Sequence, residues 1–372
     1  MSQNTRESVW AISKASIPFY RDGITPGKEE GSKWVQVEGL VDKLSVSISG
    51  TVWAIMHDKL FYRSGVTPNS EQGSSWTAVE HDFSTDMLEA GGSCLWVYGR
   101  DNMLHVRTGM GFHSSSAGIT RIGSGWTSTP SPTSPSGVTD MAITSQDDLF
   151  VLTDDNKLFK RDGCTQSCPE GVSWAKCALP RLGGGGFLGL GAAPEVINIA
   201  GGLEHLWAVT DSHEVWRAPY AGIITERSWE RIHGQKMVYV CPSMCDKEIT
   251  WGINNRDQMF VRTSPQVGRY EWLRQGTIMF RTVTVGVMLN YTIPSEQPKA
   301  TLQRMSSNAG LLDQPRDELK VTDMPFKIEQ CDQMSEDLLN ALVIPVLSKT
   351  EVLQRFTYDF TTEETVLSDG VR

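Results

Sequence analysis

The sequence predicts an all-β fold built from one repeated unit of short antiparallel strands. Three observations support this: the unit recurs along the chain, its apolar residues alternate over four or five positions, and the composition is rich in turn residues and tryptophan. The clearest copy is residues 52–79, VWAIMHDKLFYRSGVTPNSEQGSSWTAV. It reads as two strands joined by a turn at His57–Asp58, then a Gly-Val-Thr-Pro corner, a loop and a third strand opening at Trp76.

Six copies of the unit can be aligned between residues 9 and 286. We number them as repeats one to six. Each opens on a leading aromatic residue: Trp10, Trp53, Trp96, Phe150, Trp207 and Trp251. Each then reaches an arginine: Arg21, Arg63, Arg107, Arg161, Arg217 and Arg262. Each ends on a second tryptophan, the closing Trp: Trp34, Trp76, Trp126, Trp174, Trp229 and Trp272.

A fourth strand-like segment precedes every leading aromatic except the first. These segments are residues 44–49, 86–91, 140–145, 196–201 and 237–242. The missing copy follows the last repeat, at residues 277–286 (TIMFRTVTVG). This predicts a six-bladed β-propeller of four-stranded antiparallel blades, in which the C-terminal strand completes the first blade. An open array is the alternative, but it would not need a displaced strand.

Charge and hydropathy exclude several partners. The net charge of −10 argues against nucleic acid and against an anionic membrane surface. No apolar run approaches the roughly 18–20 residues of a transmembrane segment. The N-terminus lacks the hydrophobic core of a signal peptide. We therefore expect a cytoplasmic protein, with release or cell-surface display by an unconventional route as the alternative.

No catalytic, metal or cofactor site is expected. The seven histidines are scattered through turns, and neither a nucleophile elbow nor a phosphate-binding loop is present. The odd count of seven cysteines favours reduced thiols, with small-loop disulfides at Cys164–Cys168 or Cys241–Cys245 as the alternative. A zinc site would need cysteine pairs from different blades to converge without histidines.

Residues 287–372 lie outside the repeat pattern and are expected to form a small C-terminal extension beside the propeller of residues 1–286. Residues 317–330 could form a strand pair, residues 335–347 a short amphipathic helix and residues 354–364 a strand. This extension would pack on the propeller or on a protein partner.

The unit VWAI…KLFYRSGVTP…GSSWTAV resembles the tectonin repeat of slime-mould tectonins, horseshoe-crab tachylectins, fish egg lectins and a mushroom lectin. The resemblance covers about residues 9–286, with Phe150 as one departure and the lost Gly corner of repeats five and six as another. It implies a six-bladed propeller that binds glycans or bacterial surface polysaccharide without catalysis. The family also contains intracellular propellers that bind proteins or lipids, so an interaction scaffold docked by its tail is the alternative function. A weaker third reading is the targeting half of a membrane-active protein.

The repeated residues have both structural and binding uses. We expect the leading aromatics to fill the space between blades, whereas the closing Trp residues could either pack or stack on sugar rings. The arginines could bond backbone carbonyls and a neighbouring blade, or present a fork to sugar hydroxyls. Repeats one, two and four keep both the Gly corner and a Gly shortly before the closing Trp. Ligand binding is therefore predicted at Arg21, Trp34, Arg63, Trp76, Arg161 and Trp174.

Overall fold

The structure is a computed structural model that describes residues 5–67, 69–110, 122–132, 137–165, 167–181, 194–266, 269–289, 356–359 and 364–367. The chain divides into two compact units, Met1–Asn290 and Tyr291–Arg372. The regular secondary structure of the described residues is β-strand, apart from one short 3-10 helix, η1 (Glu226–Ser228). The all-β prediction is confirmed.

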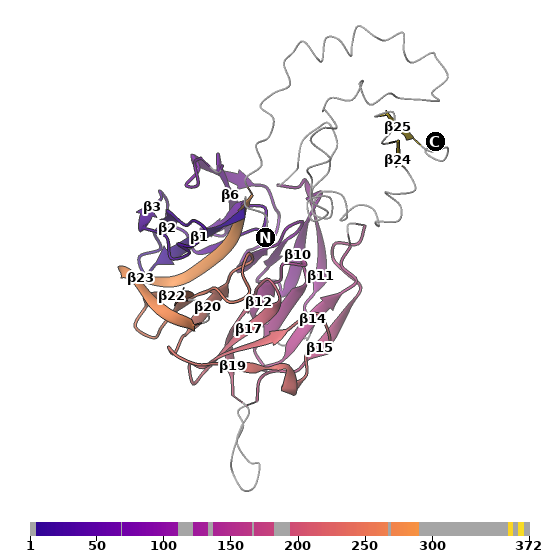
Figure 1. The fold of residues 1–372 in the computed structure, drawn as a ribbon. Helices are drawn as coiled ribbons and strands as arrows, with labels where there is room; N and C mark the ends of the chain where they lie inside the picture. Colours follow the sequence, from indigo (N-terminus) through magenta and orange to yellow (C-terminus); the bar gives the residue numbers. More distant parts are fainter. Residues whose placement is uncertain are drawn as a thin grey trace, which may run out of the picture. The chain divides into compact units, whose positions relative to one another are not determined.

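Four sheets of the first unit contain four antiparallel strands each, as the sequence predicts, and they are arranged as propeller blades (Figure 1). Repeat two forms β4 (Lys43–Val46), β5 (Val52–Met56), β6 (Lys59–Ser64) and β7 (Ser75–Val79). Repeat three forms β8 (Met87–Ala90), β9 (Leu95–Tyr98), β10 (Met103–Thr108) and β11 (Gly125–Pro130). Repeat four forms β12 (Val138–Ile143), β13 (Leu149–Thr153), β14 (Leu158–Asp162) and β15 (Ser173–Cys177). Repeat five forms β16 (Val196–Gly201), β17 (His205–Thr210), β18 (Val215–Pro219) and β19 (Glu230–Ile232).

Repeats six and one share a seven-stranded sheet in the order β20-β21-β22-β23-β1-β2-β3. Its repeat-six strands are β20 (Tyr239–Pro242), β21 (Thr250–Ile253) and β22 (Gln258–Gln266). Its repeat-one strands are β1 (Thr5–Ser13), β2 (Pro18–Asp22) and β3 (Lys33–Gln36). Between them lies β23 (Arg269–Leu289).

Strand β23 is longer than the sequence predicts. Instead of a separate strand at residues 277–286, one continuous strand includes both this segment and the strand that opens near Trp272. Its first part pairs with β22, for example Arg262 with Trp272. Its second part pairs with β1, from Ser13 opposite Phe280 to Thr5 opposite Leu289. The first and last described strands of this unit are therefore hydrogen-bonded to each other.

The first strand of each sheet contacts the first strand of the next. Along the chain these contacts join β4 to β8, β8 to β12, β12 to β16 and β16 to β20, and further contacts join β20 to β23 and β23 to β4. Polar side chains on these strands accept backbone N–H groups from the neighbouring strand. The bonds are Thr284 Oγ1 to Val46 N (3.0 Å), Ser45 Oγ to Ala90 N (3.0 Å), Asp140 Oδ2 to Ile199 N (2.8 Å) and Asn198 Oδ1 to Val240 N (2.9 Å). These bonds join neighbouring sheets where their strands are too far apart to pair.

The hairpin that follows each leading strand turns through a residue with positive φ. These residues are Ser16, Asp58, Asn102, Asn156, His213 and Asp257, with φ between 54° and 63°. Small and polar residues tolerate this left-handed conformation best, so the residue types at the hairpin tips suit their backbone conformation.

The core consists of six buried clusters. Each contains the leading aromatic of one repeat, and the closing Trp of the next repeat packs in it or against it. In the cluster of repeats one and two, Trp10 and Trp76 meet edge to face at 6.4 Å, and Trp251 and Trp34 of repeats six and one meet at 5.8 Å. All six leading aromatics are at most 1% exposed, so their predicted role as core residues is confirmed.

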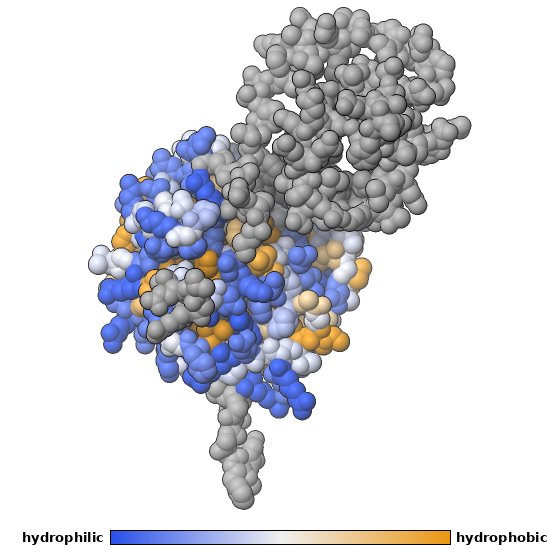
Figure 2. Space-filling model, in the orientation of Figure 1, coloured by the Kyte–Doolittle hydropathy of each residue, from blue (hydrophilic) through white to orange (hydrophobic). Residues whose placement is uncertain are grey.

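The second unit contains a described hairpin of β24 (Phe356–Asp359) and β25 (Glu364–Leu367). Part of the strand predicted at residues 354–364 is thus found, while the predictions for residues 317–330 and 335–347 lie outside the described residues. In the described part of the chain, no helix has the length and apolar character to cross a membrane. The face of the first unit seen in Figure 2 is mostly hydrophilic, with hydrophobic residues in small separate groups.

Candidate ligand-binding surfaces

The arginines of repeats one to four occupy equivalent buried positions. Each donates its Nε–H to the backbone carbonyl of a loop residue that precedes the closing Trp. The acceptors are Glu30 for Arg21 (2.7 Å), Gln72 for Arg63 (2.8 Å), Ile122 for Arg107 (3.0 Å) and Glu170 for Arg161 (2.7 Å). The four side chains are between 4% and 8% exposed. Each arginine therefore holds its own loop closed.

The same guanidinium groups lie over the closing Trp rings. The distances from Cζ to the ring centroid are 5.2 Å for Arg21 and Trp34, 5.1 Å for Arg63 and Trp76, 4.9 Å for Arg107 and Trp126, and 4.9 Å for Arg161 and Trp174. A cation over an indole face at this distance is stabilising by roughly 0.5–2 kcal/mol, more when water is excluded. The sequence-predicted residues are thus brought together in pairs, one pair per repeat.

Three of these arginines also bond to the preceding repeat around the fold. Arg63 donates two hydrogen bonds to the carboxylate of Glu38, and these bonds lower the pKa of Glu38 below its usual value. Arg21 donates to Gln275 Oε1 (2.8 Å) and Arg161 to Thr129 Oγ1 (2.9 Å). Much of the donor capacity of these guanidinium groups is therefore used within the protein.

Among repeats one to four, a similar bond places three of the closing Trp residues. Their indole N–H groups donate to a carbonyl at the end of the preceding outer strand: Trp76 to Glu38 (2.9 Å), Trp126 to Glu80 (3.1 Å) and Trp174 to Pro130 (3.4 Å). The Nε1 of Trp34 has no such partner. All four rings are half-buried, so part of each indole stays accessible beside its loop.

A glycine three residues before the closing Trp allows this arrangement. Gly31, Gly73, Gly123 and Gly171 all have positive φ, from 63° to 68°. At Gly73 a Cβ would lie 2.5 Å from the carbonyl oxygen of Ser64 and 2.9 Å from Cγ of Arg63. Only a residue without a side chain lets the loop pass so close to the arginine.

Repeats one, two and four share the rest of their loop as well. An isolated β-bridge joins Thr25 to Lys28, Thr67 to Ser70 and Thr165 to Cys168. The three threonines are exposed, and the closing Trp that follows in the same repeat is half-buried. These three repeats contain the six residues at which the sequence predicts ligand binding: Arg21, Trp34, Arg63, Trp76, Arg161 and Trp174.

The third repeat has an Arg–Trp pair that our sequence analysis did not select. Arg107 and Trp126 match the geometry of the other three pairs, and Gly109 and Gly123 both have positive φ. The signal was present as Arg-Thr-Gly followed by Gly-Ser-Gly-Trp. Between these glycines the chain is longer than in repeats one, two and four, and residues 111–121 lie outside the described residues.

Repeats five and six lack this arrangement, in line with their missing glycines. Arg217 lies 5.7 Å from Trp207, the leading aromatic, and pairs with Glu230 and Glu248. Arg262 lies over Tyr270 at 4.8 Å and shares Glu248. In both repeats acidic side chains bind the arginine, and Arg262 also donates to the backbone carbonyl of Glu248 (2.7 Å).

Metal ligands do not gather in the described ranges, where no group of three or more His, Cys, Asp or Glu residues could hold a metal ion. The six cysteines in those ranges are free thiols, and Cys331 lies outside them. Burial raises the pKa of Cys164 to about 11, so this thiol stays protonated at neutral pH.

Comparison with solved structures finds similar chains at low identity. They include a chain in a nidogen/laminin complex (8% identity, TM-score 0.49, covering 77% of this chain and 98% of that chain). Others are yeast RCC1 (Prp20) bound to Kap60 (11%, 0.43, 77% and 75%) and human WBSCR16 (12%, 0.40, 73% and 78%). TM-scores below 0.5 at such identity carry no information about ligand or activity. No curated protein matches the sequence.

Comparison with protein families gives one informative match. Residues 1–100 match the family model described as the Tectonin domain. This segment holds repeats one and two and the leading Trp96 of repeat three. The resemblance found in the repeat motif is confirmed for residues 1–100, which match this model and lie in a β-propeller arrangement.

Proposed function

We propose that this chain is a lectin-like propeller that binds glycans, such as bacterial surface polysaccharide, at several similar sites and without catalysis. The observation that carries the proposal is the recurrence of one arrangement three times: a bridged loop with an exposed threonine, followed in the same repeat by a half-buried indole. A ligand that repeats along a polymer is the kind of partner that such a repeated surface fits.

We also propose that the ring has six blades and is closed by β23, with residues 1–286 forming the propeller and residues 287–372 an extension. The seven-stranded sheet would count as two blades, since β23 completes both repeat six and repeat one. Two observations support closure: the contact of β23 with β4, and the bond from Val46 N to Thr284 Oγ1. A closed ring holds its loops at fixed spacing, which multivalent binding requires.

The contacts at each proposed site come from the loop and the indole. Arg21, Arg63 and Arg161 use their Nε–H on loop carbonyls, so they shape the site more than they contact ligand. The exposed parts of Trp34, Trp76 and Trp174 can stack on the C–H face of a sugar ring, and loop hydroxyls and backbone groups can bond its hydroxyls.

Affinity at one such shallow site is expected to be millimolar to micromolar, about −4 to −8 kcal/mol. Several sites on one rigid body can raise the apparent affinity for a dense surface by a further ~10²–10⁴. Repeating the loop would therefore raise the apparent affinity for a dense surface more than deepening one pocket would.

Glycan-array screening followed by calorimetry with a monovalent sugar tests the proposal. We expect three sites in the native chain, one per bridged loop, and two in Trp76→Phe, which keeps an aromatic ring in the core but loses the indole. Trp229→Phe is the matched control, because Trp229 is buried in repeat five and lacks the loop. Binding to no glycan would reject the lectin proposal and favour the protein-interaction scaffold. An unchanged number of sites in Trp76→Phe would mean that the binding sites do not include this indole.

A further inference from the structure

A different surface lies where repeats four and five meet. It is a groove of about 790 Å³ lined by three segments: the hairpin at residues 156–158, the end of β15 with the residues that follow it (176–181), and residues 224–227 in repeat five. Its volume falls within the range of about 300–1,000 Å³ typical of ligand sites. None of the Arg–Trp pairs of repeats one to four contributes to it.

The floor of the groove is apolar and firmly held. Leu158 and Ile224 are buried there, and Leu179 packs against the same core cluster. Ala178 ties the two repeats together, since its N–H donates to the carbonyl of Ile224 (3.1 Å) and its own carbonyl accepts the indole N–H of Trp229 (2.9 Å). The groove is therefore fixed by the packing of the two sheets.

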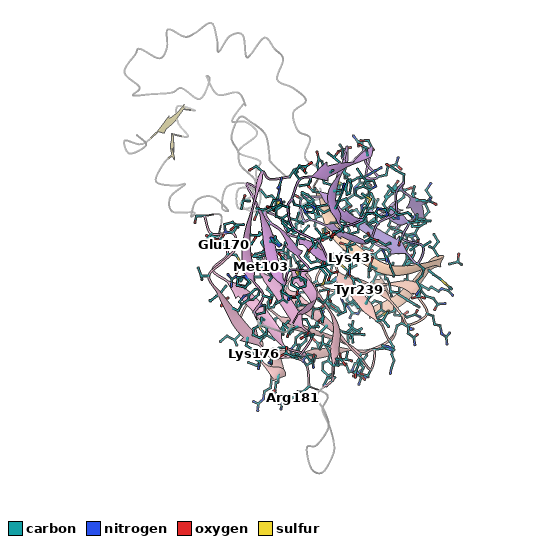
Figure 3. All side chains as sticks on the ribbon, turned by 180° about the vertical axis from the view of Figure 1, so that it is seen from behind. Lys43, Met103, Glu170, Lys176, Arg181 and Tyr239 are labelled. Atoms are coloured by element: carbon teal, nitrogen blue, oxygen red, sulfur yellow. The ribbon has the colours of Figure 1, made fainter. Side chains whose placement is uncertain are left out.

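Positive charge gathers around this floor. Four cationic side chains and one carboxylate line the groove: Lys157, Lys176, Arg181, Arg227 and Glu226. Arg181 pairs with Glu226 at 2.9 Å, and Lys157 pairs with Asp155. Lys176 and Arg227 are exposed, and neither forms an ion pair with the described residues. Lys176 and Arg181 lie toward the same end of the first unit in Figure 3.

This local charge is opposite to that of the whole chain. With a net charge of −10, the protein repels polyanions in general, so anion binding needs a local site. Lysine and arginine bind sulfate, phosphate and carboxylate groups through charge-assisted hydrogen bonds. The apolar floor would accept the C–H face of the ring that carries such a group.

We propose that this groove binds an acidic saccharide, a sugar bearing sulfate, phosphate or carboxylate groups, with Lys176 and Arg227 as the anion-binding residues. The choice of a saccharide rests on the glycan-binding function proposed above, whereas the choice of an anion rests on the groove itself. The groove adds a charge-selective site to the loops of repeats one, two and four.

The test measures binding of the full chain to dextran sulfate, polygalacturonate, unmodified dextran and phosphatidylserine vesicles, at low and at physiological salt. We expect binding to one or both acidic polymers, little to dextran, and weakening with salt. Lys176→Glu with Arg227→Glu should reduce the affinity by about tenfold or more. The matched control is Lys59→Glu with Arg256→Glu, which makes the same charge change at two exposed positions outside the groove. Its affinity for the acidic polymers should stay within about twofold of that of the native chain. Equal melting temperatures establish that both variants are folded.

The outcomes separate this inference from the proposed function. If the protein binds neutral glycans but neither acidic polymer, the assignment of the groove is overturned, while the proposed glycan sites at the loops stand. Binding to acidic polymers that the groove variant loses and the control keeps supports the groove, even if no neutral glycan binds. Equal loss in both variants means general electrostatic attraction and overturns the assignment. Binding only to phosphatidylserine vesicles, and to neither acidic polymer, also overturns it.

Discussion

Gly31 lies directly against the side chain of Arg21, at φ +64°. A Cβ there would be 2.9 Å from the carbonyl oxygen of Asp22 and 3.1 Å from Cγ of Arg21. Gly27, in the same loop at φ +82°, has nothing within 4 Å of the equivalent point. The two glycines have the same backbone constraint, and only Gly31 has the steric one.

We therefore predict that Gly31→Ala destabilises the protein more than Gly27→Ala. The Gly27 change should cost about 1 kcal/mol, the usual penalty of a left-handed non-glycine residue. The Gly31 change adds overlap with backbone and should cost about 3 kcal/mol. Urea unfolding of both variants measures the difference. Equal midpoints would mean that the loop does not need to approach Arg21.

The residue pattern predicted part of this site. The alignment of the repeats placed the arginine and the closing Trp at equivalent positions in each copy. The missing glycines distinguished repeats five and six from the other four. It could not show which atoms of the arginine remain free, because this depends on carbonyls such as that of Glu30 and on partners such as Gln275. Gln275 is far from Arg21 in the sequence, so no local pattern contains that bond.

At the scale of single elements, β23 contributes to two blade-like groups of strands. It pairs with β22 before residue 280 and with β1 from there on. Three side chains of its second part, Phe280, Val283 and Val285, are at most 2% exposed. Losing buried side chains of this kind costs roughly 2–4 kcal/mol each, a sum comparable to the roughly 5–15 kcal/mol of total stability expected of a domain.

A chain that ends after Gln275 should therefore fail to unfold cooperatively, because β1 loses its hydrogen-bonded neighbour. A chain that ends after Asn290 keeps all of β23 and should retain the β-sheet signal and the cooperative transition of the full chain. Circular dichroism and thermal unfolding compare the two. A shorter chain with an unchanged melting temperature would contradict the proposed closure by β23.

The strand pattern predicted this element in part. Alternating residues identified residues 277–286 as a strand, and their position after the last repeat suggested pairing with β1. The pattern did not predict that the strand continues unbroken from Arg269, because Gly276 lies between the two parts and reads as a turn. In the structure Gly276 has positive φ within the strand, so it marks an irregularity in place of an end.

At the scale of the whole molecule, features formed by several repeats were not predicted. The basic groove combines residues from three segments of two repeats, none of which carries a motif. The same holds for the centre of the fold, where a cavity of about 20 Å³ is lined by residues such as Ser45, Glu89, Tyr239 and Thr284. In Figure 3, Tyr239 and Lys43 appear near the middle of the first unit.

Acidic side chains occupy this centre and its surroundings. Burial raises the pKa of Glu89 to about 8, and the charge of Asp140 adds to this effect. Burial also raises the pKa of Asp140 to about 6 and that of Glu7 to about 7. Glu89 and Asp140 keep some exposed surface, and we attribute it to the narrow central cavity, where hydration is poor compared with bulk solvent.

These shifts predict that stability falls as the pH rises from about 4.5 to about 8. In this range the folded state holds protons that the unfolded chain has lost, so unfolding releases protons and becomes more favourable with pH. Each such carboxyl contributes a slope of up to about 1.4 kcal/mol per pH unit. Urea unfolding across this range should show the decline, and Glu89→Gln should make it shallower, because the amide stays neutral. Glu80→Gln, an exposed control one repeat earlier, should leave the slope unchanged. Equal slopes for Glu89→Gln and the native chain would mean that Glu89 ionises freely in the folded protein, with water hydrating the central cavity well.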